Sequence, residues 1–334
     1  MSLPVLICDD SALARKQMAR SLPPALNAEI TFAVHGLDAL EQLEQNDFKI
    51  MFLDLTMPEL DGFGTLDEIQ ARGIDIKVVV VSGDIQPKAK ERVMASGAKA
   101  FIQKPIDKDI LNGVLKELVE PPSQPQMVAP APLDLPVLKR RDIYREVANV
   151  AIGVAADALA RHFDVFVHLP LPNVNILEVS ELQMALRDLA DNDQVSGVCQ
   201  GFSGEGLAGE ALVLLSDSSV CDLKKLMKVP AESEELEELE LFMDVSNILV
   251  GSFLNGLGKQ AEVRFFQSSP ELLGQHISID SIIQNTEGAF QKTMTFEVSY
   301  NIDGTAIRCD LLFMFVDESL PLLDDKLSYL MEDF

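Results

Sequence analysis

Short apolar runs alternate with amphipathic stretches over the first 120 residues, and this alternation limits the fold more than any other feature. Each apolar run has the length of a strand and is followed by a segment with helical periodicity. This order predicts an α/β domain with a doubly wound (βα)5 sheet and an active site at the carboxyl ends of its strands. The expected strands are Val5–Cys8, Glu29–Val34, Ile50–Leu55, Lys77–Val81 and Ala100–Ile102, and the clearest helices are Ala12–Leu22, Leu37–Glu44 and Lys88–Ser96.

A proline-rich stretch follows this region. Six prolines lie among the 16 residues 121–136, mixed with Ser, Gln and Ala. This composition indicates a semi-extended linker, which spans up to roughly 50 Å at about 3.1 Å per residue. We therefore predict one domain over residues 1–120, a linker over 121–136 and a second domain over 137–334, each long enough to bury its own core.

Polar side chains stand where the predicted strands end. Asp9 and Asp10 follow the first strand, Asp54 ends the third, Ser82 ends the fourth and Lys104 follows the fifth. Any one of the aspartates fits a helix cap or a turn, but together the five residues are predicted to meet in one crevice. Three carboxylates there need a cation, so Asp9, Asp10 and Asp54 are candidate ligands of Mg2+. Phosphoryl transfer would use Asp54 as nucleophile, with Ser82 and Lys104 on the phosphoryl oxygens.

These five positions resemble the response-regulator receiver family, of which the chemotaxis protein CheY is the simplest member. The resemblance implies that Asp54 is the phosphoacceptor and that a sensor histidine kinase supplies the phosphoryl group. It also implies that Phe101 is a switch aromatic, although a plain core phenylalanine explains that residue equally well. Thr56 and Asp84 resemble the positions that tune hydrolysis of the phosphoryl group in this family.

Residues 137–334 contain one order of elements twice: a helix, a segment with a proline, and a hairpin. The helix patterns begin near Arg141 and near Glu234, and the second runs to Leu257. The predicted hairpins pair Gln194–Gln200 with Leu207–Leu215 around a glycine-rich turn, 201–206, and Lys292–Tyr300 with Thr305–Val316 around the turn 301–304.

Each predicted helix carries a polar stripe, because residues three and four apart share a helix face. The first stripe is Asp142, Glu146 and Asn149, and the second is Glu240, Asp244 and Asn247, each residue 98 positions later. A proline follows each asparagine after 23 positions, at Pro172 and Pro270. A solvated helix face explains one such stripe, but two copies with a proline at the same offset favour a functional role.

The stripes and prolines resemble the CheC/CheX/FliY family of chemotaxis phosphatases. The resemblance implies an α+β domain with an internal pseudo-two-fold repeat, in which two long helices pack on a pair of three-stranded repeats that form one sheet. It implies hydrolysis of a receiver's aspartyl phosphate, where Glu146 pairs with the receiver's lysine and Asn149, on an exposed ridge, orients a water. Asp244 and Asn247 would form a second site, in which Asp replaces the family's Glu and shortens the reach by about 1.5 Å.

The leading hypothesis is a response regulator whose output domain hydrolyses aspartyl phosphate, on this chain's own Asp54 or on a CheY-like partner. The alternative is a non-catalytic interaction module that docks to receivers or to the flagellar switch. A net charge of −26 and a single short basic cluster at Lys139–Arg141 argue against nucleic acid as a partner. No secretory or membrane-spanning segment is expected, so we predict a cytoplasmic protein with reduced thiols; a homodimer is left open.

Overall fold

The structure is a computed structural model that describes residues 2–119, 139–178, 181, 183–184, 194–226, 235–278 and 292–332. Its contacts divide the chain into two compact units, Met1–Glu146 and Val147–Phe334, so the boundary falls inside one long helix. The predicted linker, residues 121–136, lies outside the described residues.

The first unit contains a parallel sheet of five strands in the order β2-β1-β3-β4-β5. The strands are β1 (Leu3–Cys8), β2 (Ala28–Ala33), β3 (Ile50–Leu53), β4 (Lys77–Ser82) and β5 (Ala100–Gln103). This sheet confirms the predicted doubly wound α/β fold, and the predicted strands agree with the observed ones to within two residues at each end.

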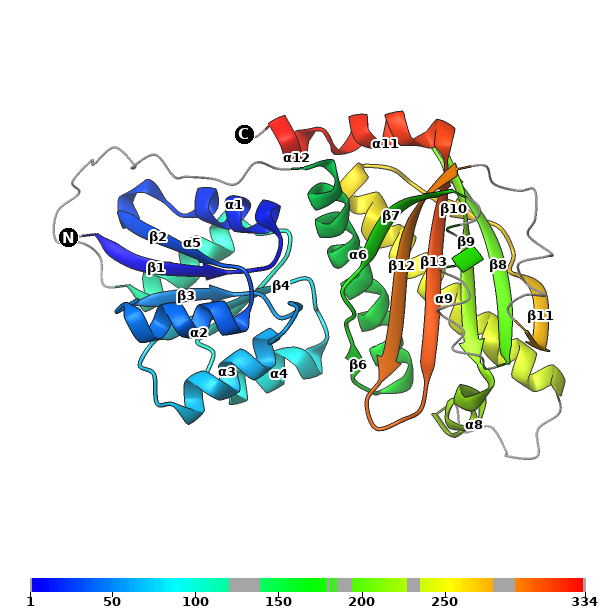
Figure 1. The fold of residues 1–334 in the computed structure, drawn as a ribbon, viewed down its shortest axis with the longest axis horizontal. Helices are drawn as coiled ribbons and strands as arrows, with labels where there is room; N and C mark the ends of the chain where they lie inside the picture. The colour runs from blue at the N-terminus through cyan, green and yellow to red at the C-terminus, as the bar shows by residue number, and fades with distance from the viewer. Residues whose placement is uncertain are drawn as a thin grey trace. The chain divides into compact units, whose positions relative to one another are not determined.

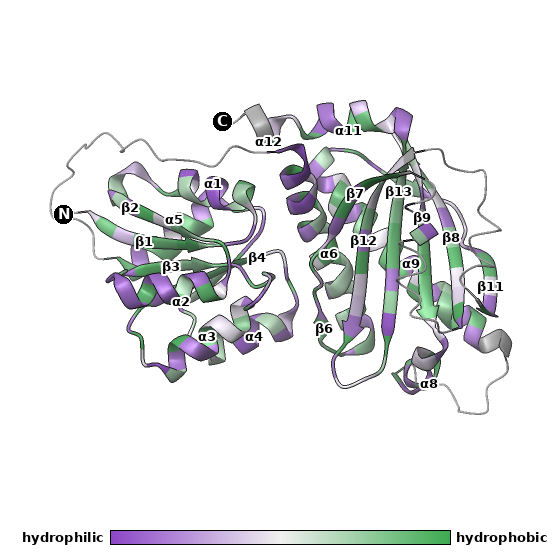
Figure 2. Cartoon of the chain, viewed as in Figure 1, coloured by the Kyte–Doolittle hydropathy of each residue, from purple (hydrophilic) through white to green (hydrophobic). Residues whose placement is uncertain are grey.

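Helices cover both faces of this sheet (Figure 1). The helices are α1 (Ala12–Ser21), α2 (Gly36–Gln45), α3 (Gly62–Ala71), α4 (Pro87–Ala95) and α5 (Lys108–Leu118). Met18 of α1 and Leu111 of α5 pack in one apolar cluster, and Leu40 of α2 and Leu66 of α3 pack in the cluster on the opposite face. The strands between them are buried on both sides and are correspondingly hydrophobic (Figure 2), as a parallel sheet requires.

The second unit is built on a mostly antiparallel sheet in the order β10-β8-β9-β13-β12-β6, with β11 paired to β8 and β7 paired to β12. Its strands are β6 (Val167–His168), β7 (Asn173–Glu178), β8 (Val195–Gly204), β9 (Leu207–Ser216), β10 (Phe266–Gln267), β11 (Glu271–Ile277), β12 (Lys292–Ile302) and β13 (Arg308–Val316). The expectation of two three-stranded repeats is therefore wrong in number, because each half adds a fourth, two-residue strand.

Two long helices, α6 (Arg140–Phe163) and α9 (Glu235–Ala261), pack on the same face of this sheet. Phe253 of α9 stacks on Phe313 of β13 with ring centroids 4.0 Å apart, and the Tyr300 hydroxyl of β12 donates to the carbonyl oxygen of Ile152 in α6, at 3.3 Å. The helices also touch each other: a Cβ at Gly256 would lie 2.7 Å from the Cα of Ala151. Shorter helices are α8 (Asp217–Leu226), α11 (Leu320–Leu327) and α12 (Tyr329–Glu332).

The strand pairs of the two halves correspond at an offset of 98 residues. Phe266 pairs with Ser203 in one half, and His168 pairs with Asn301 in the other. Glu271 likewise pairs with Cys199, and Asn173 with Glu297. Subtracting 98 from Phe266 and adding 98 to Ser203 gives the pair His168 and Asn301. The same operation converts the pair Glu271 and Cys199 into the pair Asn173 and Glu297.

The glycine-rich segment 201–206 is mostly strand, which corrects the prediction of a turn there. β8 continues to Gly204, and the tight turn is confined to Glu205 and Gly206, both with positive φ. Gly204 is needed for close packing, since a Cβ there would lie 2.5 Å from the carbonyl oxygen of Arg264.

One described helix is long and apolar enough to cross a membrane, judged by length and composition alone. It is the stretch Glu238–Ala261 of α9, and 61% of its apolar window is buried in the fold. A core helix of a soluble protein has the same composition, and α9 packs on the sheet as such a helix does.

Candidate functional site

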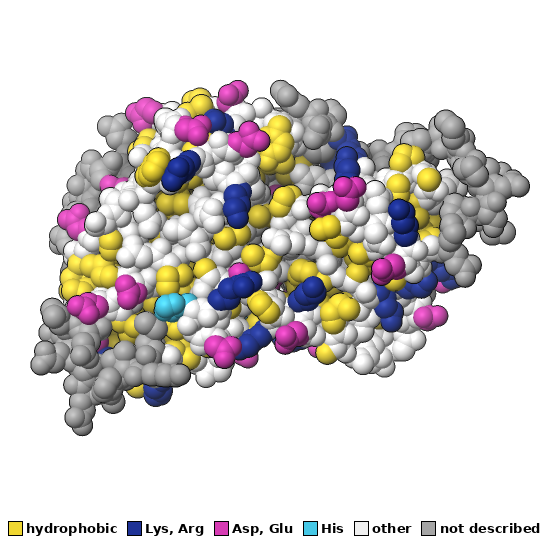
Figure 3. Space-filling model, turned by 180° about the vertical axis from the view of Figure 1, so that it is seen from behind, with side chains coloured by type: hydrophobic (Ala, Val, Ile, Leu, Met, Phe, Trp, Pro, Cys, Tyr) yellow, Lys and Arg dark blue, Asp and Glu magenta, His cyan; other side chains and the backbone are white. Residues whose placement is uncertain are grey.

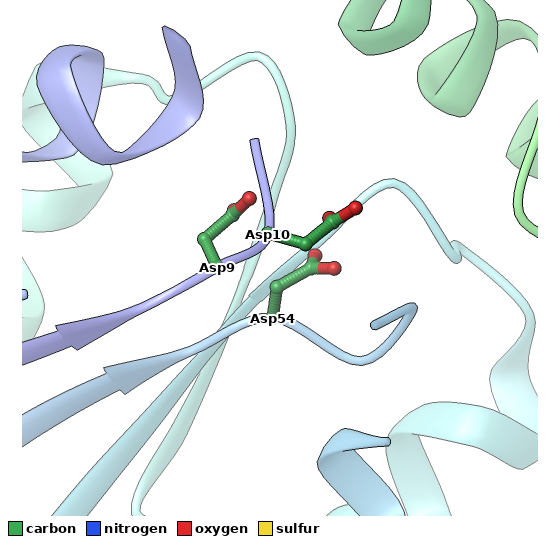
Figure 4. A group of neighbouring side chains, drawn as sticks. All are labelled: Asp9, Asp10 and Asp54. Atoms are coloured by element: carbon green, nitrogen blue, oxygen red, sulfur yellow. The ribbon is translucent and has the colours of Figure 1, made fainter. Parts of the chain in front are cut away.

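Three carboxyl groups stand together beyond the ends of two neighbouring strands of the first unit (Figure 4). Asp9 and Asp10 follow β1, and Asp54 follows β3, which pairs directly with β1. One carboxylate oxygen from each lies within 4.8 Å of the others. Backbone amides hold two of these side chains, because Ser11 N donates to Asp9 at 2.8 Å and Thr56 N donates to Asp54 at 2.9 Å.

Lys104 brings an ammonium group to the same cluster. Its Nζ lies 2.8 Å from Asp9 Oδ2 and 3.2 Å from Asp54 Oδ1, and its side chain is 6% exposed. The Lys104 amide donates to the carbonyl oxygen of Ser82 at 2.9 Å, so the end of β4 fixes the position of the Lys104 backbone. Burial by itself lowers the pKa of Lys104, but the Asp54 and Asp9 carboxylates hold that pKa well above its ordinary value. The lysine is therefore charged at every physiological pH.

The three carboxyl groups ionise less readily than ordinary aspartates. Burial raises the pKa of Asp9, Asp10 and Asp54, and the pKa of Asp54 reaches about 6 even though the Lys104 ammonium opposes the shift. The ordinary pKa of the unfolded chain is 3.8, so this carboxyl makes the fold less stable as pH rises from about 4 through 6. The single ammonium group of Lys104 is thus not enough to keep all three carboxyl groups ionised at their ordinary pKa.

The donor set fits a hard divalent cation. It offers oxygen ligands only, as Mg2+ prefers, and Oδ1 of Asp10 is buried without a hydrogen-bond partner among the described residues. Bound there, the ion would be held by Asp9, Asp10 and Asp54 and would neutralise their charge.

Mg2+ affinity is expected to fall in acid, because protons compete with the metal for the same carboxylates. With the pKa of Asp54 at about 6, only about a quarter of this group is ionised at pH 5.5, compared with nearly all of it at pH 7.5. We therefore predict that the dissociation constant for Mg2+ rises at least about fourfold between pH 7.5 and 5.5. Isothermal titration calorimetry at the two pH values measures this change, and an affinity that does not depend on pH would contradict it.

The first unit also includes the start of α6, whose charged residues contact the cluster. Glu146 Oε1 lies 3.2 Å from Lys104 Nζ, and both side chains are less than a tenth exposed. Arg145 Nη2 lies 2.6 Å from Asp10 Oδ2. Glu146 is the residue that the polar stripe of α6 predicts as a partner for a receiver's lysine.

The first stripe is more buried than the sequence led us to expect. Glu146 is 5% exposed and Asn149 is 8% exposed, so the expectation of an exposed ridge is wrong here. The pair with Lys104 accounts for the burial of Glu146.

The second stripe is more accessible. On α9, Asp244 is exposed and Asn247 is half-buried. Asn247 Oδ1 accepts a hydrogen bond of 2.8 Å from Nε2 of Gln200, which lies on β8. The two asparagines therefore have different environments, although their positions in sequence correspond.

The remaining predicted residues of the receiver site lie in the first unit. Ser82 is fully buried at the end of β4, and Phe101 on β5 is partly buried against the apolar cluster below the sheet. Thr56 is partly buried, and the buried Asp84 accepts a hydrogen bond from Gln86 N at 3.0 Å. The roles of Phe101, Thr56 and Asp84 remain predictions.

Sequence reasoning missed two residues of these sites. Arg145 lies three residues after Asp142 and four before Asn149, so it shares the helix face of the polar stripe. Its counterpart in the second copy, Met243, is apolar, so the repeat did not point to it. Gln200 is 1% exposed, and its signal was a long polar residue in a strand of otherwise apolar or small residues. A buried amide of this kind needs hydrogen-bond partners, which would have pointed to the neighbouring helix.

Known proteins resemble the first unit most clearly. Residues 5–116 match the family described as "Response regulator receiver domain". A protein-glutamate methylesterase/protein-glutamine glutaminase of Symbiobacterium thermophilum is 40% identical over 111 residues, which are 32% of this chain and 30% of that protein. The sensor histidine kinase RcsC of Salmonella typhimurium is 30% identical over 116 residues, which are 35% of this chain and 12% of that protein. The chain thus spans less than a third of the length of these relatives.

Among solved structures, FliY of Thermotoga maritima matches with a TM-score of 0.44 and 18% identity, covering 59% of this chain and 100% of that one. The family match ends at residue 116, two residues before the end of α5, and it contains the whole cluster of Asp9, Asp10, Asp54, Ser82 and Lys104. Residues 5–116 therefore form a CheY-like response regulator receiver domain at the N-terminal end of the described chain.

Proposed function

We propose that this chain is a response regulator phosphorylated on Asp54, and that α6 supplies the groups that hydrolyse the aspartyl phosphate. The observation that carries the proposal is the ion pair between Glu146 and Lys104. Lysine at this position binds the phosphoryl group in a receiver, so a carboxylate placed on it from α6 lies beside the reacting atoms. Asn149 follows on the same helix face, about 4.5 Å further along the axis.

The receiver half of the reaction follows from the cluster. Bound Mg2+ would neutralise charge on the phosphoryl oxygens, as it does in phosphoryl transfer generally. Asp54 attacks the phosphorus of a phosphohistidine on a sensor histidine kinase, and the bond between phosphorus and the histidine nitrogen breaks. Lys104 and the Ser82 hydroxyl bind the oxygens of the transferred group. The receiver half therefore needs nothing from the second unit.

The hydrolytic half needs one ordered water. In the proposed reaction, Glu146 holds Lys104, and the Asn149 carboxamide orients a water in line with the bond between phosphorus and the Asp54 oxygen. The internal correspondence at 98 residues supports the relation to the CheC/CheX/FliY phosphatases, because it applies both to the stripes and to the strand pairs.

A non-catalytic clamp is the second candidate, and the burial of Asn149 favours it. In that reading, Glu146 competes with the phosphoryl group for Lys104 and slows phosphorylation without accelerating hydrolysis. Binding of an interaction partner would then depend on whether the ion pair between Glu146 and Lys104 is formed or broken. The net charge of −26 argues against nucleic acid in either case, and on the face seen in Figure 3 the basic side chains are interspersed with acidic ones.

The Glu146→Gln substitution separates these two candidates. If Glu146 serves hydrolysis, we expect the full-length variant to lose phosphate from Asp54 about tenfold more slowly than the wild type, since the ion pair with Lys104 is lost. Phosphate release is measured after phosphorylation with acetyl phosphate and Mg2+ and removal of the donor. Faster phosphorylation with an unchanged rate of release would instead support the clamp.

Asp157→Asn is the matched control. Asp157 lies on the same helix and pairs with Arg161 at 2.8 Å, so this variant also loses one carboxylate charge and one ion pair of α6. Its rates of phosphorylation and of phosphate release are expected to equal those of the wild type.

A further inference from the structure

The start of α6 brings a positive charge to the acidic cluster of the first unit. Arg145 Nη2 donates to Asp10 Oδ2 at 2.6 Å, whereas Oδ1 of Asp10 is buried without a hydrogen-bond partner among the described residues. Both residues belong to the first unit. One carboxyl group therefore has one oxygen bound to a cation of the chain and the other available to a metal ion.

Arg145 is less enclosed than Lys104, the other cation of the cluster. The Arg145 side chain is 31% exposed, compared with 6% for the Lys104 side chain. Three carboxylates lie within 3.2 Å of Lys104 Nζ and retain it in the cluster. A long, partly exposed arginine can instead turn its head group into water when its partner binds another cation.

The internal repeat shows that this arginine is an addition to the first copy. The residue 98 positions after Arg145 is Met243, which carries no charge. The basic residues 139–141 correspond in the same way to residues 237–239, which are two glutamates and a leucine. The start of α6 is thus basic where the start of α9 is acidic, and its charge complements the carboxylates of the cluster.

We infer that Arg145 competes with Mg2+ for Asp10, and so sets how tightly the cluster of Asp9, Asp10 and Asp54 binds the ion. The inference rests on the proposed function, because it concerns the metal that phosphorylation of Asp54 requires. Two cations at one buried carboxylate repel each other even where each contacts a different oxygen. The position of Arg145 therefore determines the Mg2+ concentration at which Asp54 can accept a phosphoryl group.

The charges of the cluster determine the expected sign of the effect. Four carboxylates and two cations meet there: Asp9, Asp10, Asp54 and Glu146 with Lys104 and Arg145. An uncharged side chain at position 145 would leave three carboxylates in excess instead of two, and would increase the attraction for a divalent cation. If the arginine merely oriented Asp10, its loss would misplace a ligand and weaken metal binding. The direction of the change thus separates the two roles.

The Mg2+ affinity of the full-length chain tests the inference. Isothermal titration calorimetry with MgCl2 at pH 7.5, without a phosphoryl donor, compares the wild type with Arg145→Gln. We expect the dissociation constant of this variant to be about tenfold lower, because the competing cation is absent. Arg145→Lys keeps the charge, so its dissociation constant is expected to lie near that of the wild type.

Arg161→Gln is the matched control. It makes the same substitution on the same helix and breaks the pair with Asp157, at 2.8 Å, outside the cluster. Its dissociation constant for Mg2+ is expected to equal that of the wild type.

A second measurement uses the wild-type chain. In spectra of the 15N-labelled protein, the side-chain N–H signals of Arg145 are identified by their absence from Arg145→Lys. Saturating Mg2+ is expected to speed the exchange of these hydrogens with water, because competition acts equally in both directions.

The inference is overturned if Arg145→Gln binds Mg2+ no more tightly than the wild type, if neither protein binds Mg2+, or if Mg2+ leaves the exchange of the Arg145 hydrogens unchanged. No phosphoryl group is present in these experiments. Their failure therefore leaves hydrolysis by the groups of α6 to be decided separately, by the rate of phosphate release from Glu146→Gln.

Discussion

The Asp54→Asn chain is expected to incorporate no phosphoryl group from acetyl phosphate or from a sensor kinase in the presence of Mg2+. The substitution preserves the shape of a side chain that is 3% exposed, but it replaces the nucleophilic carboxylate by an amide that cannot form the acyl phosphate. Incorporation is measured as acid-stable, base-labile label on the full-length protein.

Asp47→Asn provides the comparison for this experiment. Asp47 is an exposed aspartate whose carboxylate pairs with Lys49 at 2.7 Å, so the same chemical change is made outside the cluster. Its labelling is expected to equal that of the wild type. Stoichiometric labelling of the Asp54→Asn chain would mean that another residue accepts the phosphoryl group, and the assignment of the whole cluster would then fail.

The first unit could be predicted from its sequence because parallel strands convert chain order into spatial order. A buried strand such as Val78–Val81 is apolar throughout, so its end is marked by the first polar residue, Ser82. Once the strand ends are known, their convergence at one edge follows from the doubly wound topology. The sequence had already identified Asp9, Asp54 and Lys104 as members of one site, and the structure adds the distances between them.

The second unit was harder to predict, because its antiparallel sheet depends on pairings between distant segments. Strands of two residues, such as Val167–His168, are too short for any periodicity to reveal them. The glycines of β8 suggested a turn, but Gly204 is required where backbones touch, since a Cβ there would lie 2.5 Å from the carbonyl oxygen of Arg264. Contacts between backbone segments that are distant in the chain leave no recognisable pattern in the local sequence.

The sequences of the two polar stripes also gave no indication that Asn149 and Asn247 have different environments. Helical spacing placed Asn149 and Asn247 on equivalent faces, and it is the strand beneath each helix that makes them unequal. Gln200 belongs to β8, 47 residues before Asn247 in the chain, so only the three-dimensional structure brings the pair together.

Asn149→Ala is expected to slow the loss of phosphate from Asp54 about 100-fold in the full-length chain. Without the carboxamide, the attacking water loses its orientation, and a misplacement of about 1 Å costs a factor of this size. Phosphate release after removal of acetyl phosphate measures the rate, and a thermal melt checks that the buried substitution leaves the chain folded.

Asn247→Ala is the internal comparison for that rate, since it removes the same side chain from the corresponding position of α9. Because Gln200 engages the oxygen of Asn247, this variant should release phosphate within about twofold of the wild type. Equal slowing by both substitutions would show that the two stripes act alike. No slowing by Asn149→Ala, alone or combined with Asn247→Ala, would remove hydrolysis from the second unit and leave Glu146 as a clamp on Lys104.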